Sequence, residues 1–183
     1  FARKEAPMPK LPECHAFIAC SLDGFIARPD GDIAWLTSLP VPEGEDFGYA
    51  AFVAGMDAIL MGRGSYEKVL TFPSWPYQLP VTVLSGTLPP GPAVHATITD
   101  APLVPALERL AASGARRIYA DGGKVISALL REGFLTRMVV TRVPVLLGAG
   151  LPLFAGTGEI GLTLEEVRHW PNGFVQSAYR PEP

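Results

Sequence analysis

The chain has 183 residues, 48% of them hydrophobic, and carries a formal net charge of −3. This length and composition fit one globular domain with a full core and exclude an intrinsically disordered chain. The negative charge and the absence of a basic run argue against nucleic-acid binding, and no stretch approaches the ~20 apolar residues of a membrane helix.

The N-terminal residues 1–13 are polar and rich in proline, so we expect a flexible lead-in followed by a single domain over 14–183. Residues 15–21, HAFIACS, are typical of a short buried strand. The only cysteines, Cys14 and Cys20, lie on or beside this strand, too close along an extended chain to bridge easily. We expect reduced core cysteines in a cytoplasmic protein. The histidines are far apart and no C-x-x-C motif occurs, so no metal site is expected.

Alternating helix and strand patterns follow the first strand. The first half of the chain predicts a turn at 21–24, a helix at 45–55, a strand at 57–61, a helix at 66–71 capped by Ser65, a strand at 81–85 and a short strand at 93–97. The second half predicts a helix at 103–115, a strand at 116–120, a helix at 124–133 and a long strand at 137–147 that Pro144 interrupts.

The C-terminal part has a different pattern. Residues 162–170 and 174–180 read as two strands joined by Pro171-Asn172-Gly173, and Asn-Gly is the strongest short signal for a β-hairpin. We therefore expect an antiparallel pair of strands added to an otherwise mostly parallel α/β sheet.

Glycine follows five of the predicted strands. The strand exits are Ser21-Leu22-Asp23-Gly24, Gly62-Arg63-Gly64-Ser65, Ser85-Gly86-Thr87, Asp121-Gly122-Gly123-Lys124 and Gly148-Ala149-Gly150. Parallel α/β sheets bind ligands beyond the carboxyl ends of their strands. Glycine at so many exits favours a long ligand lying across this edge, although tight turns alone also require glycine.

Two of these exits have the chemistry of a phosphate site. Residues 62–65 and 122–124 each lead directly into a predicted helix, whose first N–H groups are unpaired and lie at the positive end of the helix dipole. Arg63 and Lys124 add positive charge, and Lys124 at a helix start is unfavourable unless an anion binds there. Neither exit matches G-x-G-x-x-G or G-x-x-x-x-G-K-[ST], so an ordinary Rossmann or P-loop site is not predicted.

Several stretches together resemble a known family. MGRGSYE at 61–67, the strand ending at Leu84-Ser85 and the helix opened by Gly122-Gly123 resemble dihydrofolate reductase. SLDGFIARPDGDIAWL at 21–36 and PVLLGAGLPLF at 144–154 are more similar to the C-terminal reductase domain of the bifunctional deaminase/reductase of riboflavin synthesis. The resemblance implies a three-layer α/β/α sandwich, a homodimer, and NADPH-dependent hydride transfer to a C=N or C=O group of a pterin-like or ribosylaminopyrimidine substrate.

The resemblance also assigns roles to individual residues by their positions. Gly62, Arg63, Gly64 and Ser65 would hold phosphates, and Leu84 and Ser85 would lie near the adenosine ribose. Gly122, Gly123, Lys124 and Val125 would hold the pyrophosphate and line the nicotinamide channel, and Ala19 and Ile26 would flank the nicotinamide ring. Asp23 and Trp35 are candidates for substrate contact; alternatively, Asp23 caps its own turn and Trp35 is a core or lid residue.

Two departures from the family pattern narrow these expectations. Gly86 stands where dihydrofolate reductases often carry a basic residue, so a preference for NADPH over NADH rests mainly on Arg63. Residues 28–45 differ from a dihydrofolate reductase, which argues against folate as the substrate. The zinc-deaminase motifs H-x-E and P-C-x-x-C do not occur in the sequence.

Reduction of a C=N bond also requires a proton donor. The carboxylates expected near the ligand edge are Asp23, Asp46 and Asp121. The position of Asp46 relative to Met61-Gly62-Arg63 resembles that of the substrate-binding carboxylate of dihydrofolate reductase, so Asp46, shielded beside Phe47, is the predicted proton source. The alternative is that Asp46 only stabilises the start of the helix at 45–55.

Three functions are open from the sequence. The first is an NADPH-dependent reductase of a small heterocycle or carbonyl compound. The second is a dinucleotide-binding regulator or sensor without catalysis, and the third is an unrelated α/β protein whose glycines serve only its turns.

Overall fold

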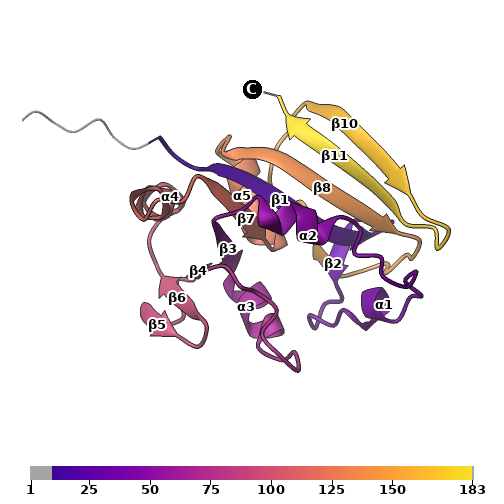
Figure 1. Cartoon of the computed structure of the whole chain (residues 1–183), viewed down its shortest axis with the longest axis horizontal. Coiled ribbons are helices and arrows are strands. Elements are labelled where there is room, and N and C mark those ends of the chain that lie inside the picture. Colours follow the sequence, from indigo (N-terminus) through magenta and orange to yellow (C-terminus); the bar gives the residue numbers. More distant parts are fainter. Residues whose placement is uncertain (1–9, 183) are drawn as a thin grey trace, which may run out of the picture.

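The computed structural model of the chain describes residues 10–182, and Figure 1 shows their arrangement. The predicted lead-in therefore lies largely outside the described residues. In the part that is described, Pro12 is buried, Leu11 packs against the core, and the first strand begins at Glu13. The first strand thus begins earlier than the sequence pattern indicated.

One large sheet of nine strands organises the molecule (Figure 1). Its strands are β1 (Glu13–Ser21), β3 (Ala58–Gly62), β4 (Val81–Leu84), β5 (Gly91–Ala93), β6 (Ala96–Thr99), β7 (Arg117–Asp121), β8 (Leu135–Val143), β10 (Leu162–His169) and β11 (Val175–Pro181). They lie in the order β10-β11-β8-β1-β7-β3-β4-β6-β5. The six strands from β8 to β6 are parallel, whereas β11 and β5 run antiparallel to their inner neighbours. A mostly parallel sheet with a C-terminal hairpin is therefore confirmed.

The helices cover both faces of the sheet. They are α1 (Ala34–Thr37), α2 (Tyr49–Ala54), α3 (Arg63–Val69), α4 (Leu103–Ala112) and α5 (Gly123–Arg131). Crossovers between parallel strands are right-handed. Through α2 and α3 the chain moves from β1 toward the β5 edge of the sheet, and through α4 and α5 it moves back toward β8. The two pairs of helices therefore lie on opposite faces, which gives the expected three layers.

Alternating side chains of β3 show the two cores that this layering creates. Leu60 points into the core under α4 and α5, with Leu107 and Ile126. Ile59 belongs to the opposite core, together with Tyr66 of α3. Because successive side chains of a strand point to opposite faces, a continuous apolar run such as that of β3 is typical of a strand buried on both sides.

Three predicted elements differ from the structure for identifiable reasons. The helix expected at 45–55 is shortened to α2, because Phe47 and Gly48 have positive φ values of 57° and 85°, which no right-handed helix contains. Ser65 is not a cap; α3 already begins at Arg63, after Gly62 in an extended conformation. The strand expected at 93–97 is a small hairpin, β5–β6, that turns at His95 with φ 58°.

A second, two-stranded sheet lies beside the ligand edge of the large one. It pairs β2 (Phe25–Ala27) with β9 (Leu151–Pro152), neither of which the sequence pattern predicted. The segment around β9 is held against α5, because the hydroxyl of Ser127 donates to the carbonyl of Leu153 and accepts from the N–H of Ala155. Two stretches far apart in the sequence are thereby brought to the same corner of the molecule.

The predicted C-terminal hairpin is confirmed, with Gly173 at φ 85° in its turn. Its outer strand β10 exposes Leu162, Leu164 and Val167. The homodimer implied by the resemblance stays a prediction. Among the helices of residues 10–182, none is long and apolar enough to cross a membrane.

Gly123 is expected to be required for stability. An added Cβ would lie 2.5 Å from the carbonyl oxygen of Pro152, which is backbone and cannot easily yield. Gly123→Ala should lower the free energy of unfolding, measured by urea denaturation, by roughly 1–3 kcal/mol. Gly64, also in a helix, has no atom within 4 Å of an added Cβ, so Gly64→Ala is the matched control. That control should be neutral or stabilising by up to about 1 kcal/mol; equal effects of the two substitutions would contradict the packing role of Gly123.

Candidate functional site

The carboxyl ends of the parallel strands meet at one edge of the sheet. β1, β3, β4, β7 and β8 end there, so the five glycine-containing exits predicted from the sequence do share one edge. The register places Gly62 beside Leu84, and Met61 beside Asp121. The residues expected to bind a dinucleotide are therefore neighbours across three adjacent strands.

The two glycine corners predicted to bind phosphate lie next to each other. Gly122 has φ 91°, and a Cβ placed on it would lie 2.5 Å from the hydroxyl oxygen of Ser65. A Cβ on Gly62 would lie 3.6 Å from a methyl group of Val125. The start of α3 and the start of α5 therefore approach so closely that only glycine fits between them at Gly122.

The start of α5 has hydrogen-bond donors available for a ligand. Among residues 10–182, no acceptor bonds to the N–H groups of Gly123, Lys124 or Val125. Ile26 of β2 comes within 3.3 Å of the position of a Cβ on Gly123, so these two predicted cofactor residues are brought together. Lys124 is exposed, whereas Val125 is buried in the core. A backbone and lysine donor set of this kind suits a phosphate.

Arg63 is held at the mouth of the site by two side chains. Its Nε donates to Glu67 at 2.6 Å, and its Nη1 donates to the hydroxyl of Thr87 at 2.9 Å. Thr87 is positioned by Ser85, whose buried hydroxyl accepts from the N–H groups of Thr87 and Leu88. Thr87 belongs to the predicted exit Ser85-Gly86-Thr87 but had no role assigned from the sequence, although a second hydroxyl two residues after Ser85 was a usable signal. A guanidinium has five donors, so Arg63 keeps donors for an anion.

Asp121 is the carboxyl with the most unusual environment. It lies at the end of β7, directly before Gly122, and is half-buried. Burial raises the pKa of Asp121 from 3.8 to about 6, and the nearby Gly122 N–H and Ser65 hydroxyl reduce this rise. The acid therefore exchanges its proton near neutral pH, as a general acid requires.

Three tyrosines surround the approach to Asp121. Burial and, to a smaller extent, the charge of Asp121 raise the pKa of Tyr49 to about 12, so the phenol stays neutral. The pKa values of Tyr77 and Tyr119 are also raised, first by burial and then by Asp121. The hydroxyl of Tyr119 donates to the carbonyl of Phe17 at 3.2 Å. Together they form an aromatic, weakly polar wall beside the acid.

Asp46 has the environment expected of a residue that only stabilises a helix start, which was the alternative to a proton donor. It is exposed, and its carboxylate accepts from the N–H groups of Gly48 and Ala50 at 2.8 Å each. These bonds lower the pKa of Asp46, that from Ala50 most. The shielding beside Phe47 assumed for a proton donor is absent, because the left-handed Phe47 turns its ring onto Trp170 and Phe174. Stabilising the start of α2 accounts for these contacts.

Asp23 and Trp35 likewise have structural partners. Asp23 is exposed, and its carboxylate accepts from the Ser21 hydroxyl and from the N–H groups of Leu147 and Gly148. The bond from Ser21 is the largest cause of its lowered pKa. Trp35 is buried with Val143 and Phe174, and Ala19 packs against the same cluster. Neither position favours the predicted substrate contact; both match the alternatives of a turn residue and a core residue.

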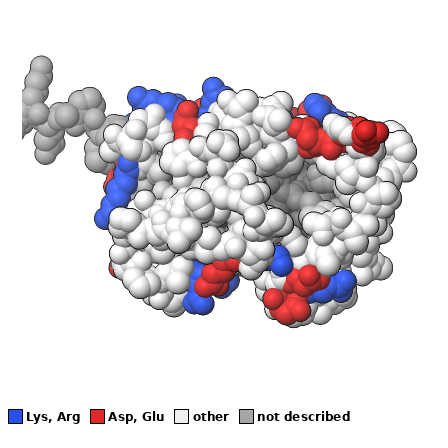
Figure 2. All heavy atoms as spheres, turned by 60° about the horizontal axis from the view of Figure 1, so that its bottom comes forward, with Lys and Arg blue, Asp and Glu red and all other residues white. Residues whose placement is uncertain are grey.

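The face that comes forward when Figure 1 is tilted is hollowed and mostly uncharged, with acidic and basic side chains at its margins (Figure 2). In the described part of the chain, no group of three His, Cys, Asp or Glu side chains could hold a metal ion. Cys14 and Cys20 are both buried and unbridged, as predicted.

Comparisons with known proteins identify relatives of this chain. The model of the RibD C-terminal domain matches residues 12–176. The protein YwjB of Bacillus subtilis is 36% identical over 143 residues, covering 75% of this chain and 80% of YwjB. A second Bacillus subtilis protein, YyaP, is 25% identical and covers 88% of this chain and 91% of its own length.

Solved structures show the same fold. A protein of Shewanella sp. PV-4, named provisionally as a riboflavin biosynthesis protein, is 35% identical and superposes with a TM-score of 0.86 over 93% of this chain and 99% of its own. The deaminase/reductase of Thermotoga maritima is 16% identical, with a TM-score of 0.72, and the match covers 94% of this chain but 57% of that longer one. The second similarity concerns the fold alone.

The raised pKa of Asp121 makes stability depend on pH. Since the folded-state pKa of about 6 exceeds the ordinary 3.8, the folded state binds the proton more tightly, and stability should fall as the pH rises from about 4 to about 6. Asp121→Asn removes this cost while keeping the shape. We compare the free energy of unfolding of the variant with that of the native protein at each pH. This difference should be more favourable to the variant at pH 7 than at pH 4, by on the order of 2 kcal/mol.

Urea denaturation at both pH values measures this difference, and Asp57→Asn is the control with the opposite sign. The Asp57 carboxylate accepts from the N–H groups of Arg116 and Arg117, which lowers its pKa. Its replacement should therefore cost stability at pH 7 more than at pH 4. A pH-independent effect of Asp121→Asn would contradict the assigned environment.

Proposed function

The chain belongs to the family of RibD C-terminal domains, and from this premise we propose that it is an NADPH-dependent reductase of a small pterin-like or ribosylaminopyrimidine substrate. The observation that carries the proposal is the Asp121-Gly122-Gly123 corner. It combines, at the ligand edge of the sheet, a carboxyl group with a pKa of about 6 and a helix start with available N–H groups. An acid beside an anion site is what reduction with a phosphate-bearing cofactor requires.

The residues present fit a dinucleotide with separated phosphates. The N–H groups at the start of α5 and the ammonium group of Lys124 would hold the pyrophosphate. Arg63 and Thr87 would hold a 2′-phosphate, since a guanidinium fixed at 2.9 Å from a hydroxyl presents donors from two side chains to one anion. Gly62 and Gly122 have no side chains, so the start of α3 and the start of α5 can approach each other closely.

The chemical role of the protein follows from the position of Asp121. When bound, NADPH supplies a hydride to the carbon of the C=N or C=O group. The protonated carboxyl of Asp121 donates the proton that the nitrogen or oxygen then requires, and solvent reprotonates the carboxylate. Tyr49 and Tyr77, whose phenols stay neutral, offer a flat apolar wall for a heterocycle and hydroxyl donors at its edge.

Arg63→Ala is expected to separate the two nicotinamide cofactors. A charge-assisted hydrogen bond contributes roughly 1.5–3 kcal/mol, so the variant should bind NADPH about tenfold or more weakly and NADH almost unchanged. Calorimetric titration with both cofactors measures this. Arg131→Ala, which removes an exposed arginine at the opposite end of α5, is the control and should change neither affinity. Equal losses for both cofactors in Arg63→Ala would exclude a role at the 2′-phosphate.

Asp121→Asn is expected to remove the proton source. With a panel of ribosylaminopyrimidines and dihydropterins, NADPH oxidation should show kcat/KM lower by at least ~10² in the variant, the usual scale for losing a general acid. NADPH affinity should be unchanged. In the native protein kcat/KM should decline above about pH 6, as Asp121 loses its proton, and the variant should lack this decline. Asp46→Asn is the control and should stay close to native turnover.

Two results would contradict this assignment. Near-native turnover of Asp121→Asn would exclude Asp121 as the acid. NADPH binding without oxidation against the whole panel would instead favour the alternative of a dinucleotide-binding regulator without catalysis.

A further inference from the structure

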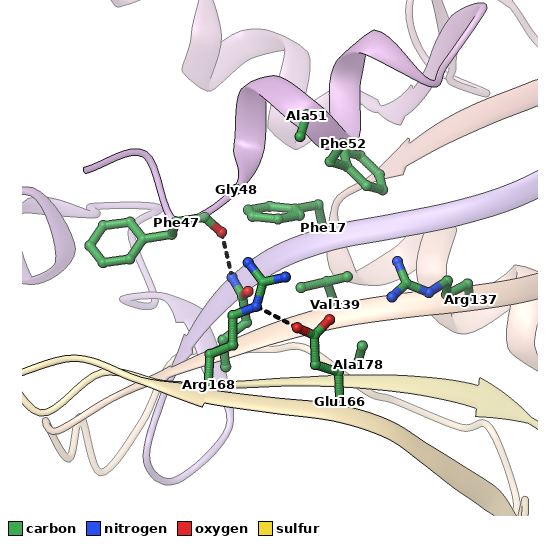
Figure 3. A pocket seen from close by; sticks show the side chains of 11 residues that line it. Phe17, Phe47, Gly48, Ala51, Phe52, Arg137, Val139, Glu166, Arg168 and Ala178 are labelled. Atoms are coloured by element: carbon green, nitrogen blue, oxygen red, sulfur yellow. Dashed lines mark hydrogen bonds and ion pairs between the residues drawn. The ribbon is translucent and has the colours of Figure 1, made fainter. Parts of the chain in front are cut away.

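A second hollow lies between α2 and the antiparallel part of the sheet. It measures about 250 Å³ and shares no lining residue with the candidate site described above. Figure 3 shows its walls: α2 and β1 on one side, and β8, β10 and β11 on the other. Phe17 and Phe52 form its inner wall, and both rings also approach the tyrosines beside Asp121. The hollow therefore lies behind the aromatic wall of the proposed substrate cleft.

The inner part of this pocket is apolar and aromatic. The rings of Phe17 and Phe52 lie 5.1 Å apart between centroids, tilted by 42°. Val139 and Ala178, neighbours in the β8–β11 ladder, form the floor, and Ala51 of α2 lines the opposite side (Figure 3). A flat apolar group of about ten non-hydrogen atoms suits a space just below the usual range for ligand pockets.

The mouth of the pocket is positively charged. Arg137 is paired with Glu165 at 2.8 Å and Arg168 with Glu166 at 2.5 Å, and Arg180 lies 3.5 Å from the same Glu165. Among the residues that line the pocket, two guanidinium groups, those of Arg137 and Arg168, are accompanied by one carboxylate, that of Glu166. The guanidinium of Arg168 reaches across the mouth to α2, where its Nη1 comes within 3.6 Å of a Cβ placed on Gly48. The unneutralised charge favours an anion at this end.

One buried polar side chain in the wall has an unused acceptor. Gln176 is only 6% exposed, and its amide nitrogen donates to the carbonyl of Phe47 at 3.1 Å and to the hydroxyl of Thr141 at 3.0 Å. No donor among residues 10–182 bonds to its amide oxygen. This oxygen is not among the fully buried polar atoms without a partner, so it is open to the pocket and adds a polar spot to an otherwise apolar wall.

We propose that this pocket is a binding site for a small aromatic carboxylic acid. The ring lies against Phe17, Phe52 and Val139, and the carboxylate pairs with the guanidinium group of Arg168 (Figure 3). This orientation puts the apolar body against the aromatic wall and the anion beside Arg168. Because the lining residues differ from those assigned to cofactor and substrate, the inference is independent of the proposed reductase activity.

Calorimetry or ligand-observed NMR with 3-phenylpropionate tests the site. A ligand of this size should bind with a dissociation constant of about 1 mM or lower. The neutral amide 3-phenylpropanamide should bind at least about tenfold more weakly, because it cannot form a charge-assisted pair with Arg168. Arg168→Gln should weaken the acid by about the same factor and leave the amide unchanged.

Two neighbouring substitutions on α2 locate the site. Ala51 is exposed and lines the pocket, so Ala51→Phe fills it from the helix side and should abolish binding of 3-phenylpropionate. Ala50 is exposed on the same helix but does not line the pocket, so Ala50→Phe should bind the acid as the native protein does. Matching thermal unfolding midpoints of the two variants show that both are folded. Two results would overturn the proposal. One is that the native protein does not bind 3-phenylpropionate at concentrations up to about 10 mM. The other is that Ala51→Phe and Arg168→Gln bind it as the native protein does.

Discussion

The contact between Ser65 and Gly122 is the constraint on which the candidate site depends. It joins the start of α3 to the start of α5, two helices that lie on opposite faces of the sheet. Gly122 can take this position because it has φ 91° and no Cβ, and any Cβ would lie 2.5 Å from the Ser65 oxygen. The same contact brings the Ser65 hydroxyl near Asp121, whose pKa it lowers against the effect of burial. One glycine, Gly122, thus fixes the positions of both the proposed cofactor site at the start of α5 and the candidate acid Asp121.

The carboxylates at this edge differ in what satisfies them. Asp23 and Asp46 are exposed, and hydrogen bonds hold both in the charged form: from the Ser21 hydroxyl and two backbone N–H groups for Asp23, and from two backbone N–H groups for Asp46. Asp121 is enclosed, and burial outweighs the few donors near it. A carboxylate held by several N–H groups has little tendency to accept a proton, whereas an enclosed one with few donors gains a proton readily. This difference in environment separates carboxylates that stabilise the structure from one that can transfer a proton, although all three residues are aspartates.

Helix α2 separates two hollows with different chemistry. On one side Tyr49 approaches Asp121, and on the other side Ala51 and Phe52 line the pocket beside β8 and β11. Phe17 contacts Tyr49 and Phe52 and therefore belongs to the wall between them. The left-handed Phe47 sets this geometry, because it ends the loop before α2 and directs its carbonyl to the buried Gln176. A ligand on one side of such a thin wall is in contact with residues that also border the other side.

The sequence by itself determined the order of the elements, the parallel sheet, the C-terminal hairpin and the edge at which the glycine exits meet. These features follow from local chemistry: apolar runs, glycine after strands, and Asn-Gly between two alternating segments. Only the tertiary structure decided which carboxylate is enclosed, that Thr87 completes the Arg63 site, and that β2 and β9 pair beside α5. Burial and contacts between distant segments are sums over the whole fold, so no local pattern around Asp46 or Asp121 could reveal them. The sequence places one aspartate at a helix start and the other after a strand, but how far each is buried is decided only when the layers are packed.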